Sequence, residues 1–326
     1  MVPSPSGPSV ARACGLSLVA LLVAAVALLP LLQTPSTTYL MSLVLQVMLF
    51  VFLAQAWNIA GGFAGLFSLG HSAFFGLGAY AYAVGVARYG LHPLAGFAIG
   101  ALLAAGLGVV TALISTRLSG MFFAMVTLGL NEILLNLASQ LNWLTRGDAG
   151  MYLRKQFTMP LGTAYYVFFG VCVAVFLVAA WVRRSRLGTL SVALKENEAF
   201  ARALGVRPLP WKMAMIAISA VATALGGACF AMYQGTVAPS TVFTFSISSK
   251  VLIVTMVGGV GTLWGPLAGA FLVVFDELVR AALGSAFSGI SLVVYGAILV
   301  VCAQFLPKGI MDALRRRFAG REARHG

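Results

Sequence analysis

The residues of this chain that could do chemistry are a few ionisable side chains inside long apolar runs. Glu132 lies in TLGLNEILLN, His71 lies in LGHSAFF, and Asp276 and Glu277 are adjacent in VVFDELVR. A charged side chain inside a membrane costs about 2.5 to 3.5 kcal/mol on insertion scales, and ion-driven carriers use such groups to bind protons. Simpler roles also fit, namely structural hydrogen bonds for Glu132 and His71 and an ion pair between Asp276 and Arg280. An ion-driven carrier is therefore one hypothesis among others.

Sequence motifs for nucleotide binding, hydrolysis and metal binding do not occur. There is no Gly-x4-Gly-Lys-Ser/Thr, and no lysine follows a glycine. Ser68–Ser72 places hydroxyls beside an imidazole, but Gly-x-Ser-x-Gly and His-Glu-x-x-His are missing, and His92 and His325 lie in a loop and in the tail. The four cysteines stand singly in apolar stretches, which predicts neither a metal site nor a disulfide framework. We therefore predict no enzyme activity and no metal or cofactor bound by this chain.

Composition predicts an all-α polytopic membrane protein. The chain is 60% hydrophobic and 9% charged, whereas about a quarter of the residues in a soluble domain are charged. Crossing the hydrocarbon core takes about 20 residues of helix, and apolar runs of that length recur along the chain. We predict about ten transmembrane helices, or eight if two glycine-rich ones turn back, in a single transmembrane domain over residues 1–326. The expected spans are 16–32, 39–60, 68–87, 94–115, 121–142, 164–182, 212–233, 247–264, 266–283 and 288–306.

The net charge of +13 predicts an orientation in the membrane rather than a nucleic-acid surface, because the basic residues lie at the ends of apolar runs. Positive residues stay on the cytoplasmic side. With both termini cytoplasmic, that side carries 15 basic residues and the outside carries six, including the loop 183–212 and the basic tail 307–326 on the inside. A retained first span is favoured over a cleaved signal peptide, since no small-x-small cleavage site closely follows the run 16–32.

Two glycine-rich segments interrupt the apolar pattern. At an offset of 197, they share five identities over 14 positions. Dense glycine allows close helix approach and weakens the helix itself. The segments predict either two structural repeats whose broken helices line a path through the membrane, or two tight packing faces. Six expected crossings between them favour parallel copies. The candidate residues for the path or the breaks are Gly61, Gly62, Gly65, Gly70, His71, Glu132, Gly258, Gly259, Gly261 and Pro266.

The loop 183–212 is the longest polar stretch and predicts an amphipathic helix from Thr189 to Leu204. Leu190, Ala193, Leu194, Ala201 and Leu204 would share one face, and Lys195, Glu196, Asn197 and Glu198 would face water. Gly205 would end the helix as a C-cap. Such a helix either rests on lipid headgroups or serves as a docking surface for a cytoplasmic partner.

The run ALKENEAFARALGV, residues 193–206, resembles the coupling helix of the branched-chain amino acid ABC transporter permeases. Lys195 stands where that family usually has arginine. The matching residues are Glu196, Asn197, Glu198, Ala201, Leu204 and Gly205. Further similar blocks, in the family's order, are residues 53–80, 117–133, 258–271 and 305–310. Residues 129–132 and Thr189 depart from the pattern. Among the members of that family, the chain looks most like the LivM-type subunit.

The resemblance implies the transmembrane permease subunit of an ATP-binding cassette importer in a bacterial inner membrane. It implies a second homologous permease, two cytoplasmic ATPase subunits that use ATP and Mg²⁺, an extracytoplasmic binding protein, and coupling through the 189–205 helix. The implied substrates are leucine, isoleucine and valine, with urea or short-chain amides as the alternative. The surrounding partner is membrane lipid, and no nucleic acid is expected.

Overall fold

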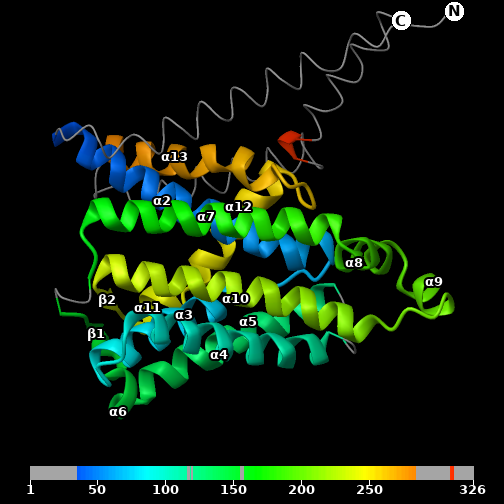
Figure 1. The fold of residues 1–326 in the computed structure, drawn as a ribbon, viewed down its shortest axis with the longest axis horizontal. Helices are drawn as coiled ribbons and strands as arrows, with labels where there is room; N and C mark the ends of the chain where they lie inside the picture. The colour runs from blue at the N-terminus through cyan, green and yellow to red at the C-terminus, as the bar shows by residue number, and fades with distance from the viewer. Residues whose placement is uncertain (1–34, 116–117, 119, 155–157, 284–308, 312–326) are drawn as a thin grey trace, which may run out of the picture.

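The computed structural model describes residues 35–115, 118, 120–154, 158–283 and 309–311, and they form a bundle of roughly parallel and antiparallel helices (Figure 1). The helices are α2 Pro35–Trp57, the π-helix η2 Asn58–Phe63, α3 His71–Ala87, α4 Pro93–Ile114, α5 Met121–Gln140, α6 Asn142–Thr145, the 3₁₀-helix η3 Gly147–Ala149, α7 Leu161–Arg184, α8 Arg186–Glu196, α9 Glu198–Ala203, α10 Pro208–Gln234, α11 Pro239–Val242, α12 Phe245–Gly258 and α13 Gly265–Leu283. The two short strands are β1 Met151–Tyr152 and β2 Thr236–Val237.

Helix α10 lies at the centre of the bundle and contacts α2, α3, α4 and α7. Helix α3 approaches it closely, because glycines remove the side chains between the two backbones. A Cβ on Gly78 would meet the carbonyl of Ala224, and one on Gly227 would meet the carbonyl of Phe75. Small residues are the usual means by which membrane helices approach so closely. Part of the glycine content of this chain is therefore explained by packing alone.

The expected polytopic membrane protein is confirmed. Six helical segments of the described residues are long and apolar enough to cross a membrane: 38–63, 93–114, 121–140, 161–184, 208–234 and 239–258. Five of these segments agree closely with expected spans, and the sixth, 239–258, overlaps the expected span 247–264 in part. Helix α3, with 17 residues, and α13 correspond to two more. The expected spans 16–32 and 288–306, and most of the basic tail, lie outside the described residues.

The expected span 247–264 is wrong at its end. Helix α12 stops at Gly258, and Gly259 and Gly261 then adopt φ angles of 125° and 75°. Residues with side chains rarely occupy this region, and a helix cannot continue through it. The chain turns there and begins α13 at Gly265.

The end of the bundle opposite α8 and α9 carries the loops that join α5 to α7 and α10 to α12 (Figure 1). Met151 pairs with Val237 and Tyr152 with Thr236 in a short antiparallel sheet. The amide of Leu153 also donates to the carbonyl of Gly235 at 2.8 Å. This sheet had no signal in the sequence, because two-residue strands are too short to show a pattern.

Candidate functional site

The first glycine-rich segment interrupts a helix, which is one of the two alternatives expected from the sequence. Helix α2 runs into the buried π-helix η2, a non-helical stretch follows from residue 64 to 70, and α3 begins at His71. A Cβ on Gly61 would meet the ring of Trp57, and Gly65 adopts a φ of 70°. Gly70 packs against the backbone of Thr127 in α5. Short π-helices are rare and often occur at functional sites.

The two glycine-rich segments meet through the side chain of Asn58, which is fully buried. Its Oδ1 accepts a hydrogen bond from the amide of Gly261 at 2.8 Å, and its Nδ2 donates to the carbonyl of Thr262 at 2.8 Å. A Cβ on Gly62 would meet both Asn58 and the amide of Gly261. The two glycine-rich segments therefore come together through Asn58, which was not among the predicted residues.

The remaining predicted break residues position the second segment. Gly258 lies against the backbone of Gly265, and Pro266 occupies the first turn of α13, where a missing amide proton is tolerated. Gly309, from the expected FLPKGI block, approaches the backbone of Gly259 so closely that a Cβ would meet its Cα. Three parts of the chain thus converge on Gly259.

The expected single helix from Thr189 to Leu204 is wrong, because the structure has two helices. Helix α8 ends at Glu196 and α9 begins at Glu198, and Asn197 between them has extended φ and ψ angles of −154° and 97°. Its Oδ1 accepts from the amide of Phe200 at 2.9 Å. Asn197 is therefore an N-cap that starts a new helix. Both helices extend from one end of the bundle (Figure 1).

Most of the charged residues of this coupling segment, residues 186–205, are exposed as expected, but Lys195 and Glu198 also make contacts within the protein. Lys195 Nζ donates to the carbonyl of Gly62 at 3.0 Å, inside the first helix break. Glu198 forms ion pairs with Lys212 at 2.9 Å and with Arg202 at 2.6 Å. Partial burial raises the pKa of the Glu198 carboxyl, but the hydrogen bonds from Lys212 and Arg202 lower it by more. The net result is a pKa below the ordinary value.

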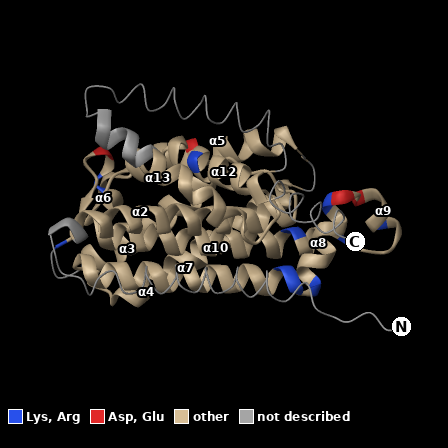
Figure 2. Ribbon diagram, turned by 90° about the horizontal axis from the view of Figure 1, so that it is seen from above, with Lys and Arg blue, Asp and Glu red and all other residues tan. Residues whose placement is uncertain are grey.

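The expected apolar face of the coupling segment is only half correct. Leu194 and Ala201 are buried, but Phe200 and Leu204 are 63% and 69% exposed. Glu196 is also exposed, and Gly205 ends α9 with a φ of 84° and open space around it. The segment therefore presents an apolar tip on α9. Lys and Arg residues are concentrated at this end of the molecule (Figure 2).

His71 forms a buried hydrogen bond with α10. Its Nε2 lies 2.9 Å from Ser219 Oγ, which in turn donates to the carbonyl of Ala56 at 2.7 Å. The ring also packs edge-on against Phe74. This geometry agrees with the structural hydrogen bond that was one of its two expected roles.

A second buried polar cluster joins α3, α5 and α12. Ser248 Oγ donates to Ser72 Oγ at 2.8 Å, and Ser72 Oγ donates to Asn131 Oδ1 at 2.8 Å. Asn131 Nδ2 donates to the carbonyl of Phe243 at 2.6 Å. Sequence reasoning chose the adjacent Glu132 and missed Asn131, although an asparagine in an apolar run is itself a signal for an interhelical hydrogen bond.

Glu132 instead lies on the exposed face of α5, in the middle of a predicted span. No side-chain hydrogen bond of Glu132 to another helix occurs among the described residues, so that expected role is not seen there. The same face carries Met125, Gly129 and Asn136, and Asn136 Nδ2 donates to the carbonyl of Glu132 at 2.8 Å. These residues recur at intervals of three and four, so they form one continuous stripe, the α5 stripe.

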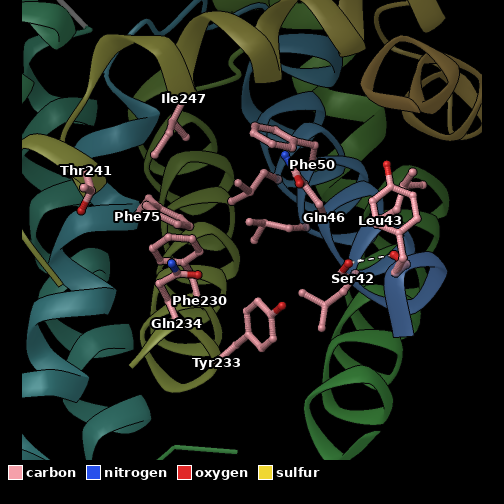
Figure 3. Close-up of a pocket in the computed structure, with 14 residues that line it drawn as sticks. Ser42, Leu43, Gln46, Phe50, Phe75, Phe230, Tyr233, Gln234, Thr241 and Ile247 are labelled. Atoms are coloured by element: carbon pink, nitrogen blue, oxygen red, sulfur yellow. Dashed lines mark hydrogen bonds between the residues drawn. The ribbon is translucent and has the colours of Figure 1, made fainter. Parts of the chain in front are cut away.

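A cavity of about 400 Å³ lies between α2, α3, α10 and α12, at the end away from the coupling segment (Figure 3). Leu49, Leu53, Phe50, Phe75 and Phe230 form much of its wall, and Gln46, Tyr233, Gln234 and Thr241 contribute polar groups. No charged residue lines it among the described residues. Its volume is typical of small-molecule sites.

A smaller cavity of about 190 Å³ lies between the coupling segment and the first helix break. Lys195, Glu198 and Lys212 line it, together with Gly65 and Phe123. The predicted coupling residues and the predicted break residues thus share one cavity wall.

Comparisons with known proteins agree with this architecture. A family model described as "Branched-chain amino acid transport system / permease component" matches residues 39–303. The high-affinity branched-chain amino acid transport system permease protein LivM of Escherichia coli K12 is 32% identical, over 92% of this chain and 75% of that protein. The LivM protein of Salmonella typhimurium LT2 is 31% identical, over 82% of this chain and 69% of that protein.

Among solved structures, PsaBC from Streptococcus pneumoniae in complex with Fab aligns with a TM-score of 0.44 and 16% identity, over 87% of this chain and 96% of that chain. The family match alone covers more than half of the sequence, and it includes both glycine-rich segments and the coupling segment. The chain belongs to the family of permease components of branched-chain amino acid transport systems.

Proposed function

We propose that this chain is one membrane-spanning permease subunit of an ATP-binding cassette importer for leucine, isoleucine and valine. The observation that carries the proposal is the coupling segment, which projects from the basic end of a helical bundle and contacts a helix break through Lys195. A channel or an enzyme does not need a projecting segment that contacts a break in a membrane helix. Family membership makes the alternative of an ion-driven carrier unnecessary.

The energy would come from other chains, since the sequence has no phosphate-binding loop. Two cytoplasmic ATPase subunits would bind ATP and Mg²⁺, and this subunit would carry no cofactor and catalyse no reaction. Phe200 and Leu204 would insert into a groove of the ATPase. Two large apolar side chains exposed on a short polar loop are typical of a protein interface. On this proposal both termini and the coupling segment are cytoplasmic.

A second homologous permease would cover the α5 stripe. Glu132 is exposed within an apolar span, and a carboxylate facing lipid costs about 2.5 to 3.5 kcal/mol on insertion scales. A protein partner or a water-filled path removes that cost. The translocation path would then run between the two permeases, with Glu132 at its wall.

Branched-chain substrates are supported by the similarity to LivM, a permease protein of branched-chain amino acid transport systems, and by the chemistry of the larger cavity. Its aromatic and aliphatic lining fits an aliphatic side chain, whereas urea is polar on every side. An extracytoplasmic binding protein would deliver the substrate to this end. A urea or short-chain amide importer is the alternative.

Uptake by cells that lack only this chain tests the substrate. We expect loss of labelled leucine uptake and unchanged urea uptake, and restoration by a plasmid copy. Unchanged leucine uptake with loss of urea uptake would reverse the assignment.

A double substitution, Phe200→Ser with Leu204→Ser, tests the coupling segment. We expect normal amounts of subunit in the membrane but little ATP-driven uptake, because the docking surface is lost. Leu94→Ser is the matched control, since Leu94 is 71% exposed at the start of α4, away from the coupling segment. Uptake at the control level in the double variant would contradict the docking role.

A further inference from the structure

Three elements that are distant in sequence meet at the first helix break. Lys195 comes from α8, Gly62 from η2, and Gly261 from the turn between α12 and α13. The Lys195 ammonium donates to the carbonyl of Gly62, and Asn58, one turn earlier in η2, holds the backbone at 261–262. The contacts therefore form an unbroken series from the coupling segment to both glycine-rich segments.

The contact of Lys195 with the break has two parts. Its aliphatic stem lies against Gly65, where a Cβ would approach Lys195 Cγ to 2.7 Å, and its Nζ reaches the carbonyl of Gly62. A Cβ on Gly261 would also lie 3.8 Å from Nζ. A side chain held at both its stem and its tip follows the backbone it touches, so α8 and η2 are joined at this point.

The contacts of Asn58 join the first glycine-rich segment to the second. The amide group faces one backbone donor, Gly261 N–H, and one backbone acceptor, Thr262 C=O, so only one orientation satisfies both. Serine or alanine cannot make both bonds. A π-helix is a place where a helix readily changes its register, and here it lies between the two contacts.

We propose that Lys195 and Asn58 are positioning residues that form a relay, through which movement of α8 shifts both glycine-rich breaks together. The proposal rests on the coupling role of residues 186–205 proposed above. Lys195 moves the Gly62 carbonyl, and η2 carries that displacement to Asn58. Asn58 then moves the turn at 261–262, which joins α12 to α13.

The first test measures substrate transported per ATP hydrolysed by the complete importer in proteoliposomes. We expect Lys195→Met to lower this ratio about tenfold, within the 5- to 150-fold range typical of coupling between sites. Lys195→Arg should restore most of the ratio, because a guanidinium can still donate to a carbonyl. Arg207→Met is the control, since it removes a positive charge from the same exposed loop without a described contact to the break. An unchanged ratio in Lys195→Met would overturn the relay.

The second test combines the two ends of the relay. Asn58→Ala and Lys195→Met should each lower the ratio, and the double variant should be no worse than the poorer single variant, since both interrupt one series of contacts. Effects that multiply would show that the two residues act separately and would overturn the proposal.

A labelling experiment removes the concern that a variant is only misfolded. Val260, 37% exposed in the second break, is replaced by cysteine, and its rate of modification is measured with and without a non-hydrolysable ATP analogue. The nucleotide should change the rate in the parent importer and in Arg207→Met, but not in Lys195→Met. An equal nucleotide effect in Lys195→Met would contradict the relay.

The outcomes also separate the relay from the proposed function. If Phe200→Ser with Leu204→Ser abolishes uptake while Lys195→Met couples normally, the coupling role holds and the relay fails. If neither set of variants changes coupling, the proposed docking role fails as well.

Discussion

Segment 58–65 continues α2 as a buried π-helix to Phe63 and leaves the helix only at Ala64 and Gly65, whereas in segment 258–265 the helix already ends at Gly258 and the chain turns through two glycines with positive φ. The first segment supplies a side chain to their contact, and the second supplies only backbone groups. The position equivalent to Asn58 at the offset of 197 is Thr255. Its hydroxyl lies 2.8 Å from the carbonyl oxygen of Val251, in α12 itself, and 3.2 Å from that of Ala54 in α2, and it donates to both. The two glycine-rich segments therefore contribute different groups to their contact, although their sequences are similar.

The two glycine-rich segments also differ in the residues that pack against them. Gly62 meets Gly261 rather than its counterpart Gly259, and Gly259 packs against Gly309. The first segment is also attached to the coupling segment through Lys195. On the proposed relay, movement of α8 therefore reaches the first segment directly and reaches the second segment only through it.

Gly62→Ala should disrupt the contact between the two glycine-rich segments most strongly. Its Cβ would collide with Asn58 and with the amide of Gly261, so it breaks the contact between the segments. Overpacking of this kind costs about 1 to 3 kcal/mol, and more where backbone cannot shift. The measurement is the thermal midpoint of the purified protein in detergent. Gly106→Ala is the matched control, because nothing lies within 4 Å of its Cβ, and equal midpoints for both variants would contradict the prediction.

Asn58→Ala and Thr262→Val compare the two segments directly. Alanine at position 58 leaves a backbone donor and a backbone acceptor unpaired, at about 1 to 3 kcal/mol for each group that is buried. Valine at position 262 removes only the hydroxyl bond to the carbonyl of Gly259, a net loss of about 0.5 to 1.5 kcal/mol. Denaturant or thermal unfolding in detergent measures both. A larger loss in Thr262→Val would reverse the assigned roles.

Acid should have the smallest effect, and it should act on the coupling segment before it acts on the second glycine-rich segment. The pKa of Glu198 is lower in the folded protein than in the unfolded chain, so its ion pairs stabilise the fold above the ordinary pKa of 4.5 and are lost as the pH falls through the folded pKa. Relative to the intrinsic exchange rate at each pH, hydrogen exchange in α9 should therefore rise as the pH falls below about 4.5, while segment 258–265 stays protected.

Glu198→Gln should abolish that acid-dependent change, and Arg202→Gln, which removes the more exposed partner, should reduce it only slightly. Exchange in α9 that is independent of pH would contradict the role of the ion pairs.

Much of the fold was predictable because each apolar run must satisfy its own backbone hydrogen bonds. Five spans therefore closely matched helices in the structure. The helix breaks at Gly61–Gly70 and Gly258–Gly261 were predictable because glycine density weakens helices. Asn197 was misread because asparagine fits a helix surface in a pattern count, whereas its side chain favours a cap. Lys195 is exposed as expected, but its bond to the Gly62 carbonyl was not predictable, because periodicity describes a helix face and cannot show which other segment lies against it.

The sequence by itself determined a many-span membrane protein, the polar coupling segment and the absence of a nucleotide-binding motif, since span length, charge and motifs are local properties. Only the tertiary structure decided that Lys195 bonds to Gly62, 133 positions away, and that Asn58 bonds to Thr262, 204 positions away. The choice of such partners depends on how the helices pack around α10, and no local pattern encodes it. The physical link from the coupling segment to both helix breaks is therefore a property of the fold.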